Sequence, residues 1–268
     1  MGKIGFLGLG SQGAPMARRM IDAGYPLILW ARRAETLQPF SGTTAEIAPD
    51  IAALGKQSEH VGICVVDDAG VQQVCEALIP AMRPGSRIAI HSTVQSKLCV
   101  TLAQQAAARD IALIDAPVSG GAPAATAGTL TVMVGGDEQA VAAARPIFET
   151  FAGFIVRLGG VGAGQMAKLI NNALMAANVA LAHHALAAGS VLRLDRAALI
   201  ELVKVSSGRS YGFEVYSRLP QPSAFAHGAK LLAKDLGLLG EALGTDDSFT
   251  AFRDVAMPFI DQVLKETK

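Results

Sequence analysis

Residues 3–30 read KIGFLGLGSQGAPMARRMIDAGYPLILW and carry the clearest structural signal of the chain. The apolar run Lys3 to Leu7 precedes a glycine turn, and the stretch Ala14 to Ala23 then repeats its apolar residues with helical spacing. Gly24 is typical of a helix end, and Leu27 to Trp30 form a second apolar run. A strand, a turn, a helix and a strand within about 30 residues predict a βαβ unit that binds a dinucleotide.

The turn itself, GLGSQG, matches the pattern G-x-G-x-x-G through Gly8, Gly10 and Gly13. The first glycine permits the tight turn, the second lets the backbone approach a pyrophosphate, and the third lets the helix pack closely against the strand. The amides at the start of the helix then face the phosphates. An ordinary glycine-rich turn is the alternative. We predict cofactor contacts along the whole loop, at Gly8, Leu9, Gly10, Ser11, Gln12 and Gly13.

The residues after the second apolar run bear on which dinucleotide binds. An NAD site usually has an acidic residue about 20 positions beyond the glycines, where it holds the ribose hydroxyls. This chain has Arg32 and Arg33 there. Because a guanidinium forms charge-assisted bonds with the 2′-phosphate of NADP, we expect NADP to be preferred, with NAD possible. Alternatively, both arginines begin a solvated helix, and Glu35 serves the ribose.

Apolar runs continue to alternate with helical stretches as far as Leu158. This alternation is typical of an α/β fold with a Rossmann-type, doubly wound, mostly parallel sheet. The further strands are predicted at Val61 to Val66, Arg87 to His91, Ile111 to Asp115, Leu130 to Val134 and Phe154 to Leu158.

The pattern changes after these strands. Gly162 and Gly164 precede an Ala-rich helical stretch from about Gln165 to Ala188, and no clear strand pattern follows it. At 1.5 Å per residue this helix is about 36 Å long, which suits a helix that connects two domains. We therefore predict a Rossmann domain over residues 1–160 and an all-helical domain over residues 161–268 that begins with a long interdomain helix.

The composition narrows the range of partners. Of 268 residues, 51% are hydrophobic and 17% charged, which excludes a disordered chain. Lysine plus arginine and aspartate plus glutamate number 23 each, so no net field attracts nucleic acid or an anionic membrane. In the apolar span Ala173 to Ala188, Asn178 and two histidines interrupt the run below the ~20 apolar residues of a membrane crossing. We expect a cytoplasmic protein with a small-molecule partner.

The cysteines and the N-terminal residues also favour a cytoplasmic location. Cys64, Cys75 and Cys99 are scattered and lack the spacing of a metal clip or a redox pair. The N-terminal residues enter a strand pattern without the features of an export signal. No metal site is predicted.

A second motif, DAPVSGG, spans Asp115 to Gly121 at the end of a predicted strand, where open α/β sheets bind ligands. Ser119 offers a hydroxyl, and Gly120 and Gly121 offer unobstructed amides. Together they form a candidate nest of donors for a substrate carboxylate. A glycine-rich turn without a ligand is the alternative.

A third motif, GGVGAGQMAKLINN, spans Gly159 to Asn172. Lys168 and Asn172 are four residues apart and therefore share one face of the predicted helix. Burial in a mainly apolar helix lowers the pKa of a lysine toward the range useful for proton transfer. The alternative is a lysine that extends its ammonium to the solvent.

In this order the motifs resemble those of the β-hydroxyacid dehydrogenase family, which includes 3-hydroxyisobutyrate dehydrogenase and tartronate semialdehyde reductase. GLGSQGAPMA resembles the family's cofactor loop, DAPVSGG with GTLTVMVGG its substrate segment, and GQMAKLINN its catalytic helix. KDL, Lys234 to Leu236, is similar to its C-terminal motif. The resemblance covers nearly the whole chain.

The resemblance implies a role for each of these residues. Lys168 would be the general acid and base that exchanges a proton with a small 3-hydroxy acid or its semialdehyde. Asn172 would orient the substrate, whose carboxylate would bind at Ser119, Gly120 and Gly121. It also implies a homodimer or homotetramer. The further cofactor contacts that we expect are Val65, Val66, Thr93 near the nicotinamide, and Lys234.

One position departs from the family pattern. Members often have Phe eight residues before the KDL aspartate, where this chain has His227. An imidazole there is a candidate contact for a more polar substrate, or it faces solvent. Two other functions stay open, a catalytically silent dinucleotide-binding protein and an imine reductase. Lys168 argues against both.

Overall fold

The computed structural model describes residues 2–244 and 246–267. By its internal contacts the chain divides into two compact units, Met1–Lys168 and Leu169–Lys268. The first unit contains the sheet, and the second is built from helices.

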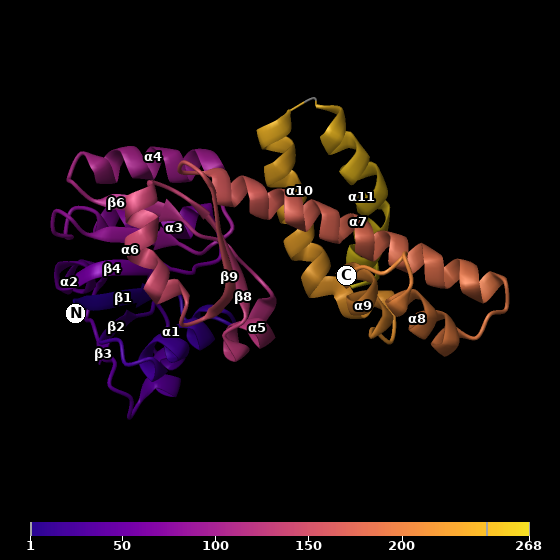
Figure 1. Ribbon diagram of the computed structural model, residues 1–268, viewed down its shortest axis with the longest axis horizontal. Helices are drawn as coiled ribbons and strands as arrows, with labels where there is room; N and C mark the ends of the chain where they lie inside the picture. Colours follow the sequence, from indigo (N-terminus) through magenta and orange to yellow (C-terminus); the bar gives the residue numbers. More distant parts are fainter. Residues whose placement is uncertain (1, 245, 268) are drawn as a thin grey trace. The chain divides into compact units, whose positions relative to one another are not determined.

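The described strands of the first unit form one sheet in the order β3-β2-β1-β4-β5-β6-β8-β7, with β9 paired to β8 (Figure 1). Neighbouring strands from β3 to β6 are parallel. The doubly wound Rossmann sheet is thus confirmed. The strand bounds are β1 Lys3–Leu7, β2 Leu27–Trp30, β3 Glu46–Ile47, β4 Ser58–Ile63, β5 Arg87–Ile90, β6 Ala112–Asp115, β7 Val118–Ser119, β8 Leu130–Gly135 and β9 Ala152–Gly159.

Several details of the sheet differ from the expectation. The strand predicted at Val61 to Val66 is β4, Ser58–Ile63, because Val65 turns its N–H to a side chain, the Ser92 hydroxyl, instead of the sheet. The strands β3 and β7 were not predicted, since two residues are too few for an alternation to show. β8 is antiparallel to β6 and β7, and the helix α5 (Gly121–Ala127) connects β7 to β8.

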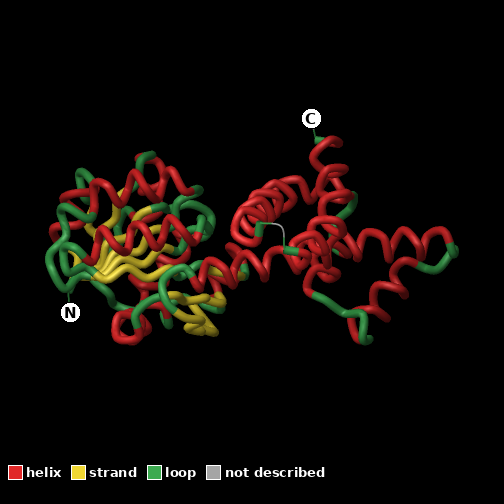
Figure 2. Tube along the Cα trace, turned by 90° about the horizontal axis from the view of Figure 1, so that it is seen from above, coloured by secondary structure: helices red, strands yellow, loops and turns green. Residues whose placement is uncertain are grey.

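Helices cover both faces of this sheet (Figure 2). On one face, α1 (Gly13–Asp22), α5 (Gly121–Ala127) and α6 (Glu138–Phe148) enclose a core around Phe6, Phe148 and Phe151. On the other face lie α2 (Ile51–Gln57), α3 (Asp68–Leu78) and α4 (Ser96–Ala107). The short 3-10 helix η1 (Ala34–Phe40) follows β2. Both faces of the sheet are therefore buried, as a parallel sheet requires.

All described elements after β9 are helical, as predicted. The long helix α7 is Ala163–Val191, which extends the predicted span at both ends. In the second unit it packs with the two following long helices around a core that includes Phe213, Tyr216 and Phe259. The remaining helices are α8 (Arg196–Val205), α9 (Tyr211–Ser217), η2 (Pro222–Phe225), α10 (Ala226–Leu243) and α11 (Asp247–Glu266).

By length and hydropathy alone, α7 is also long and apolar enough to cross a membrane. Its side chains at Leu169, Ala173, Ala176 and Val179 are instead buried in the core of the second unit. A core helix of this length passes the same test, so the structure gives α7 a packing role.

Candidate active site

The glycine loop between β1 and α1 has the geometry that a pyrophosphate needs. Gly8 has a φ of +91°, and a Cβ there would collide with the Cys64 carbonyl group. A Cβ on Gly13 would collide with the Gly8 carbonyl oxygen, whereas one on Gly10 would meet no described atom within 4 Å. Among the described residues no side chain caps α1, so amides of its first turn are available to an anion. The loop therefore fits a dinucleotide whose pyrophosphate lies over Gly10.

Arg32 and Arg33 follow β2 and are both exposed. Arg33 directly precedes η1, and its Nε lies 3.7 Å from Glu35 Oε1. Such an exposed pair contributes little to stability. Arg32 stands at the carboxyl end of the second strand, where a Rossmann fold receives the adenosine ribose. Beyond the end of β2, the Arg32 guanidinium therefore comes first, and the Glu35 carboxylate follows three residues later.

A hydrogen-bonded network joins the loops after β4 and β5 to the first turn of α7. The Val65 N–H donates to Ser92 Oγ at 2.8 Å. The Gln165 side chain, which is fully buried, donates to the Ser92 carbonyl oxygen at 2.8 Å and accepts from the Val94 N–H at 3.1 Å. Thr93 lies between these two anchored residues. The predicted cofactor contacts Val65 and Thr93 are thus held beside the start of α7.

Asp115 occupies the carboxyl end of β6 and caps the N-terminus of α7. Its Oδ1 accepts from the Gly162 N–H at 2.6 Å, and its Oδ2 accepts from the Gln165 N–H at 2.8 Å. Complete burial raises the pKa of this carboxyl, while the hydrogen bonds from the two amides oppose the rise. Gly164 is required here, because a Cβ would collide with the Met133 carbonyl oxygen. The central strand and the long helix are therefore locked together where the helix begins.

Lys168 follows Gln165 by three residues, about one helical turn later. Its side chain is only 8% exposed. Burial of an ammonium group is costly, so a lysine at such a position normally has a partner or a task. Because Asp115 and Gln165 fix the first turn of α7 to the sheet, the backbone position of Lys168 limits where its Nζ can reach.

The DAPVSGG segment runs from the last residue of β6 through β7 to the first residue of α5. Ser119 is the last residue of β7, and Gly120 and Gly121 have φ angles of +126° and +69°. L-residues with a side chain rarely adopt this region, so both positions favour glycine. Their amides lie at the exit of a strand, as predicted for a carboxylate site.

Three predicted residues lie in the second unit. The Asn172 Nδ2 donates to Asp235 Oδ2 at 2.6 Å, which joins α7 to α10. Lys234 Nζ lies 3.3 Å from Asp235 Oδ1, while His227 is exposed in the first turn of α10. In the first unit, Val66 is 79% exposed in the loop after β4. An apolar side chain exposed on such a loop is available to a ligand.

Sequence reasoning missed two residues that organise the site. From the sequence, Gln165 was assigned only to the start of the long helix, and Asp115 was assigned only to the first position of the DAPVSGG motif. A buried Asp before a Gly-rich helix start is a possible signal, since four N–H groups at a helix N-terminus need acceptors. The pairing of Gln165 with Ser92 spans 73 residues and leaves no local pattern.

The strand order, the glycine loop and the buried network at the carboxyl ends of β4, β5 and β6 define a Rossmann-type dinucleotide-binding protein. Comparison with protein families agrees. Residues 3–160 match the NAD binding domain of 6-phosphogluconate dehydrogenase. Residues 162–264 match the model described as NAD-binding of NADP-dependent 3-hydroxyisobutyrate dehydrogenase.

Individual proteins are similar over the whole chain. A curated NAD-dependent L-serine dehydrogenase of Pseudomonas aeruginosa is 34% identical, over 99% of this chain and 93% of that protein. The solved structure of Mycobacterium tuberculosis 3-hydroxyisobutyrate dehydrogenase with L-serine is 26% identical, with a TM-score of 0.86 over 100% and 99% of the two chains. The structure of Psf3 in complex with NADP+ and 2-OPP is also 26% identical, with a TM-score of 0.86 over 98% and 94%.

The chain belongs to the β-hydroxyacid dehydrogenase family. It is a hydroxyacid dehydrogenase that uses a nicotinamide dinucleotide.

Proposed function

We propose that the enzyme interconverts a small 3-hydroxy acid and its semialdehyde or ketone, with Lys168 as the general acid and base. The observation that carries this assignment is the position of Lys168, buried one turn after a helix start that Asp115 and Gln165 attach to the sheet. The family comparison supports the reaction class. Two of the relatives described above are named for L-serine and 3-hydroxyisobutyrate, and both compounds are short 3-hydroxy acids.

In this proposal a bound nicotinamide dinucleotide would supply the hydride-transfer chemistry. Lys168, as an ammonium, stabilises the negative charge that develops on the carbonyl oxygen during reduction and donates the proton. In oxidation the neutral amine takes the proton from the hydroxyl group. Ser119, Gly120 and Gly121 receive the substrate carboxylate through their hydroxyl and amides. Asn172 orients the substrate, and His227 is a further substrate contact that favours a polar group.

The test is the loss of NADPH or NADH absorbance with a panel of short carboxylate-bearing aldehydes and ketones. We expect turnover of at least one member, and a loss of several orders of magnitude in Lys168→Ala while the cofactor dissociation constant stays the same. Turnover retained in Lys168→Ala would refute the assignment. Cofactor binding without lysine-dependent turnover on any member would favour the catalytically silent alternative.

We further propose that NADP is preferred over NAD. Arg32 is exposed at the end of β2, whereas Arg33 faces Glu35, so Arg32 is the stronger candidate for the 2′-phosphate. The complex of Psf3 with NADP+ supports this preference, and the NAD-dependent relative of Pseudomonas aeruginosa points the other way. Val66, Thr93 and Lys234 remain proposed cofactor contacts.

We also propose that the enzyme is a cytoplasmic homodimer or homotetramer without nucleic-acid or membrane partners. Exposed apolar side chains in the second unit support self-association. Along α7, Ile170, Leu174 and Leu181 are each about half exposed, and the helix carries no Lys, Arg, Asp or Glu after Lys168. An uncharged apolar stripe of this length is self-complementary in a two-fold interface.

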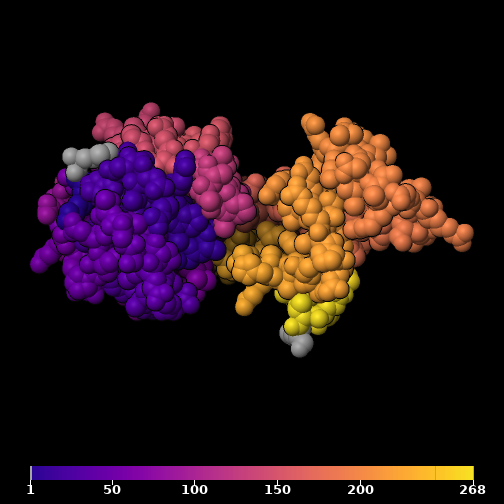
Figure 3. All heavy atoms as spheres, turned by 90° about the horizontal axis from the view of Figure 1, so that it is seen from below, coloured from indigo at the N-terminus to yellow at the C-terminus, as the bar shows by residue number. Residues whose placement is uncertain are grey.

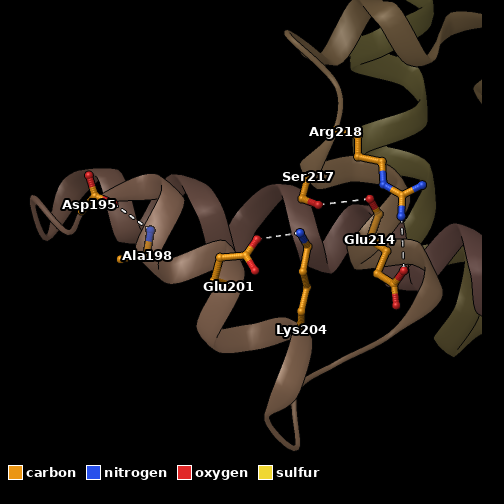
Figure 4. Close-up of polar contacts among 7 residues, drawn as sticks. All are labelled: Asp195, Ala198, Glu201, Lys204, Glu214, Ser217 and Arg218. Atoms are coloured by element: carbon orange, nitrogen blue, oxygen red, sulfur yellow. Dashed lines mark hydrogen bonds and ion pairs between the residues drawn. The ribbon is translucent and has the colours of Figure 1, made fainter.

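The neighbouring helix α8 also exposes apolar side chains. None of its residues is buried, although it contains three leucine or isoleucine residues and four valine or alanine residues, and Val205 is 79% exposed. Leu199, Ile200 and Val203 are partly buried against the core of the second unit. Polar contacts add to this packing: Asp195 caps the Ala198 N–H at 2.7 Å, and Lys204 pairs with Glu201 at 2.8 Å (Figure 4). The turn between α7 and α8 protrudes from the rest of the unit (Figure 3). Leu202 and Val205 lie outside this packed face, and in this proposal a second copy of the chain covers them.

A further inference from the structure

A row of side chains crosses the sheet near the amino ends of its central strands. Ile4 of β1 pairs with His60 of β4, and His60 pairs with Arg87 of β5. Residues in register on parallel neighbours point to the same face, so the three side chains lie side by side. This is the face that α6 covers, because Ile4 shares a core with Ile147 and Phe148.

A cavity of about 230 Å³ adjoins this row. Ile4, His60 and Arg87 line it from the sheet, and Ala143, Pro146 and Ile147 line it from α6. Gly2, Lys3, Tyr25 and Glu59 complete the lining. We call this cavity the His60 pocket. The glycine loop follows the other end of β1, about 16 Å away at ~3.3 Å per strand residue, so the pocket is separate from the cofactor site.

Three buried nitrogen atoms of the row lack hydrogen-bond partners among the described residues. His60 is 2% exposed, and neither its Nδ1 nor its Nε2 has a hydrogen-bond partner. The buried Nε of Arg87 has none either. By contrast, the equally buried His91 places Nδ1 at 2.9 Å from the Ala116 carbonyl oxygen. Buried polar groups are normally satisfied, so three such atoms beside one cavity make it a candidate binding site.

The charges define the ligand. Burial, helped by His91 and Arg87, lowers the pKa of His60 to about 3, so its ring is neutral and offers one donor and one acceptor. The buried Nε of Arg87 needs an acceptor, and the fork of a guanidinium matches a carboxylate. Lys3 Nζ is occupied by Glu46 at 2.7 Å and Gln57 at 3.2 Å. Glu59 at the rim adds a negative charge, which disfavours a dianion.

We propose that the His60 pocket binds a small monocarboxylate, with the carboxylate on Arg87 and the His60 N–H and a short apolar group against Ile4, Pro146 and Ile147. The cavity is smaller than the roughly 300–1,000 Å³ of drug-sized sites, so it admits only a few non-hydrogen atoms. Such a site allows a short carboxylic acid or a small amino acid to bind the enzyme away from its chemistry.

The test uses 3,3,3-trifluoropropionate and its ¹⁹F line broadening on the full-length enzyme. Arg87→Met removes the guanidinium and keeps the apolar stem, and Arg83→Met, at an exposed position four residues earlier, is the matched control. We expect the pocket component to bind about tenfold or more weakly in Arg87→Met and unchanged in Arg83→Met. Equal broadening in wild type and Arg87→Met overturns the proposal.

Competition experiments then show whether the pocket prefers a simple carboxylic acid or an amino acid. Displacement by propionate but not L-alanine indicates a simple acid, and displacement by L-alanine indicates that Glu59 receives the ammonium. A second measurement needs no variant of the pocket arginine. In protein labelled with ¹⁵N-histidine, the His60 ring signals, assigned from their absence in His60→Leu, should shift on addition of the ligand that displaces the probe. Unmoved His60 signals at saturation overturn the proposal.

Discussion

The side-chain amide of Asn172 donates a 2.6 Å hydrogen bond to the carboxylate of Asp235. Because a carboxylate only accepts hydrogen bonds, this contact determines which way the amide faces. The Asn172 Oδ1 in turn accepts from Asn171 Nδ2 at 3.1 Å. The KDL aspartate therefore acts on the helix that carries Lys168 through one oriented side chain.

Asp235→Ala should leave the amide without its acceptor. We expect a loss of about 1–3 kcal/mol in the free energy of unfolding, because Asp235 is buried and the bond is charge-assisted. The catalytic constant kcat should also fall. Urea unfolding and steady-state kinetics measure both. Asp235→Asn retains an acceptor oxygen, so it should recover part of each loss, and equal losses in the two variants would contradict this role.

Asp115→Asn should weaken the attachment of the start of α7 to the sheet. An amide supplies one oxygen where two N–H groups donate, so one hydrogen bond is lost, at a cost of about 1–3 kcal/mol. We expect kcat to fall while the affinity for the dinucleotide changes little. Asp137→Ala, at the exposed cap of α6, is the control: it should lower stability by about 1 kcal/mol but leave kcat unchanged.

Arg32→Asp should shift the cofactor preference toward NAD. The substituted carboxylate would repel the 2′-phosphate of NADP and accept hydrogen bonds from a free ribose. The ratio of kcat/KM for NADPH and NADH measures the change. Arg33→Asp is the matched control, since Arg33 already faces Glu35. An unchanged ratio in Arg32→Asp would show that this arginine does not read the phosphate.

Stability should decline as the pH falls below about 6.5. Burial lowers the pKa of His60 to about 3 and of His91 to about 4, so both are neutral in the folded protein. Unfolded histidines bind protons below about pH 6.5, which favours unfolding by roughly 1.4 kcal/mol per pH unit for each residue down to its folded pKa. Urea unfolding at pH 7.5 and pH 5 measures the slope. His60→Leu should flatten it, and an equally steep slope in that variant would count against His60.

Leu202→Glu and Val205→Glu should reduce self-association through α8. Both side chains are more than half exposed and apolar, and a charge there would be desolvated in an interface. Light scattering during size exclusion gives the mass of each variant. Glu138→Gln, on an exposed position of α6, serves as a control on a remote surface. A mass unchanged by both glutamate substitutions would place the interface elsewhere.

The sequence alone determined the class of fold and the location of its motifs. The strand, glycine turn and helix of residues 3–23 follow from local periodicity and from the conformational freedom of Gly8, which the structure places at a φ of +91°. The helical second half follows from the same local pattern. These features depend on residues that are neighbours in the chain, so a single sequence is sufficient to predict them.

Tertiary structure decided which distant residues meet. Asp115 accepts a hydrogen bond from the Gly162 N–H, 47 residues later in the chain, and Gln165 reaches a carbonyl group 73 residues away. His60 and Arg87 become neighbours only through the register of β4 on β5. Register depends on how whole strands and helices pack, and no local periodicity records it. The motifs could therefore be predicted from the sequence. The network that holds them, and the His60 pocket at the amino ends of the central strands, could be found only in the tertiary structure.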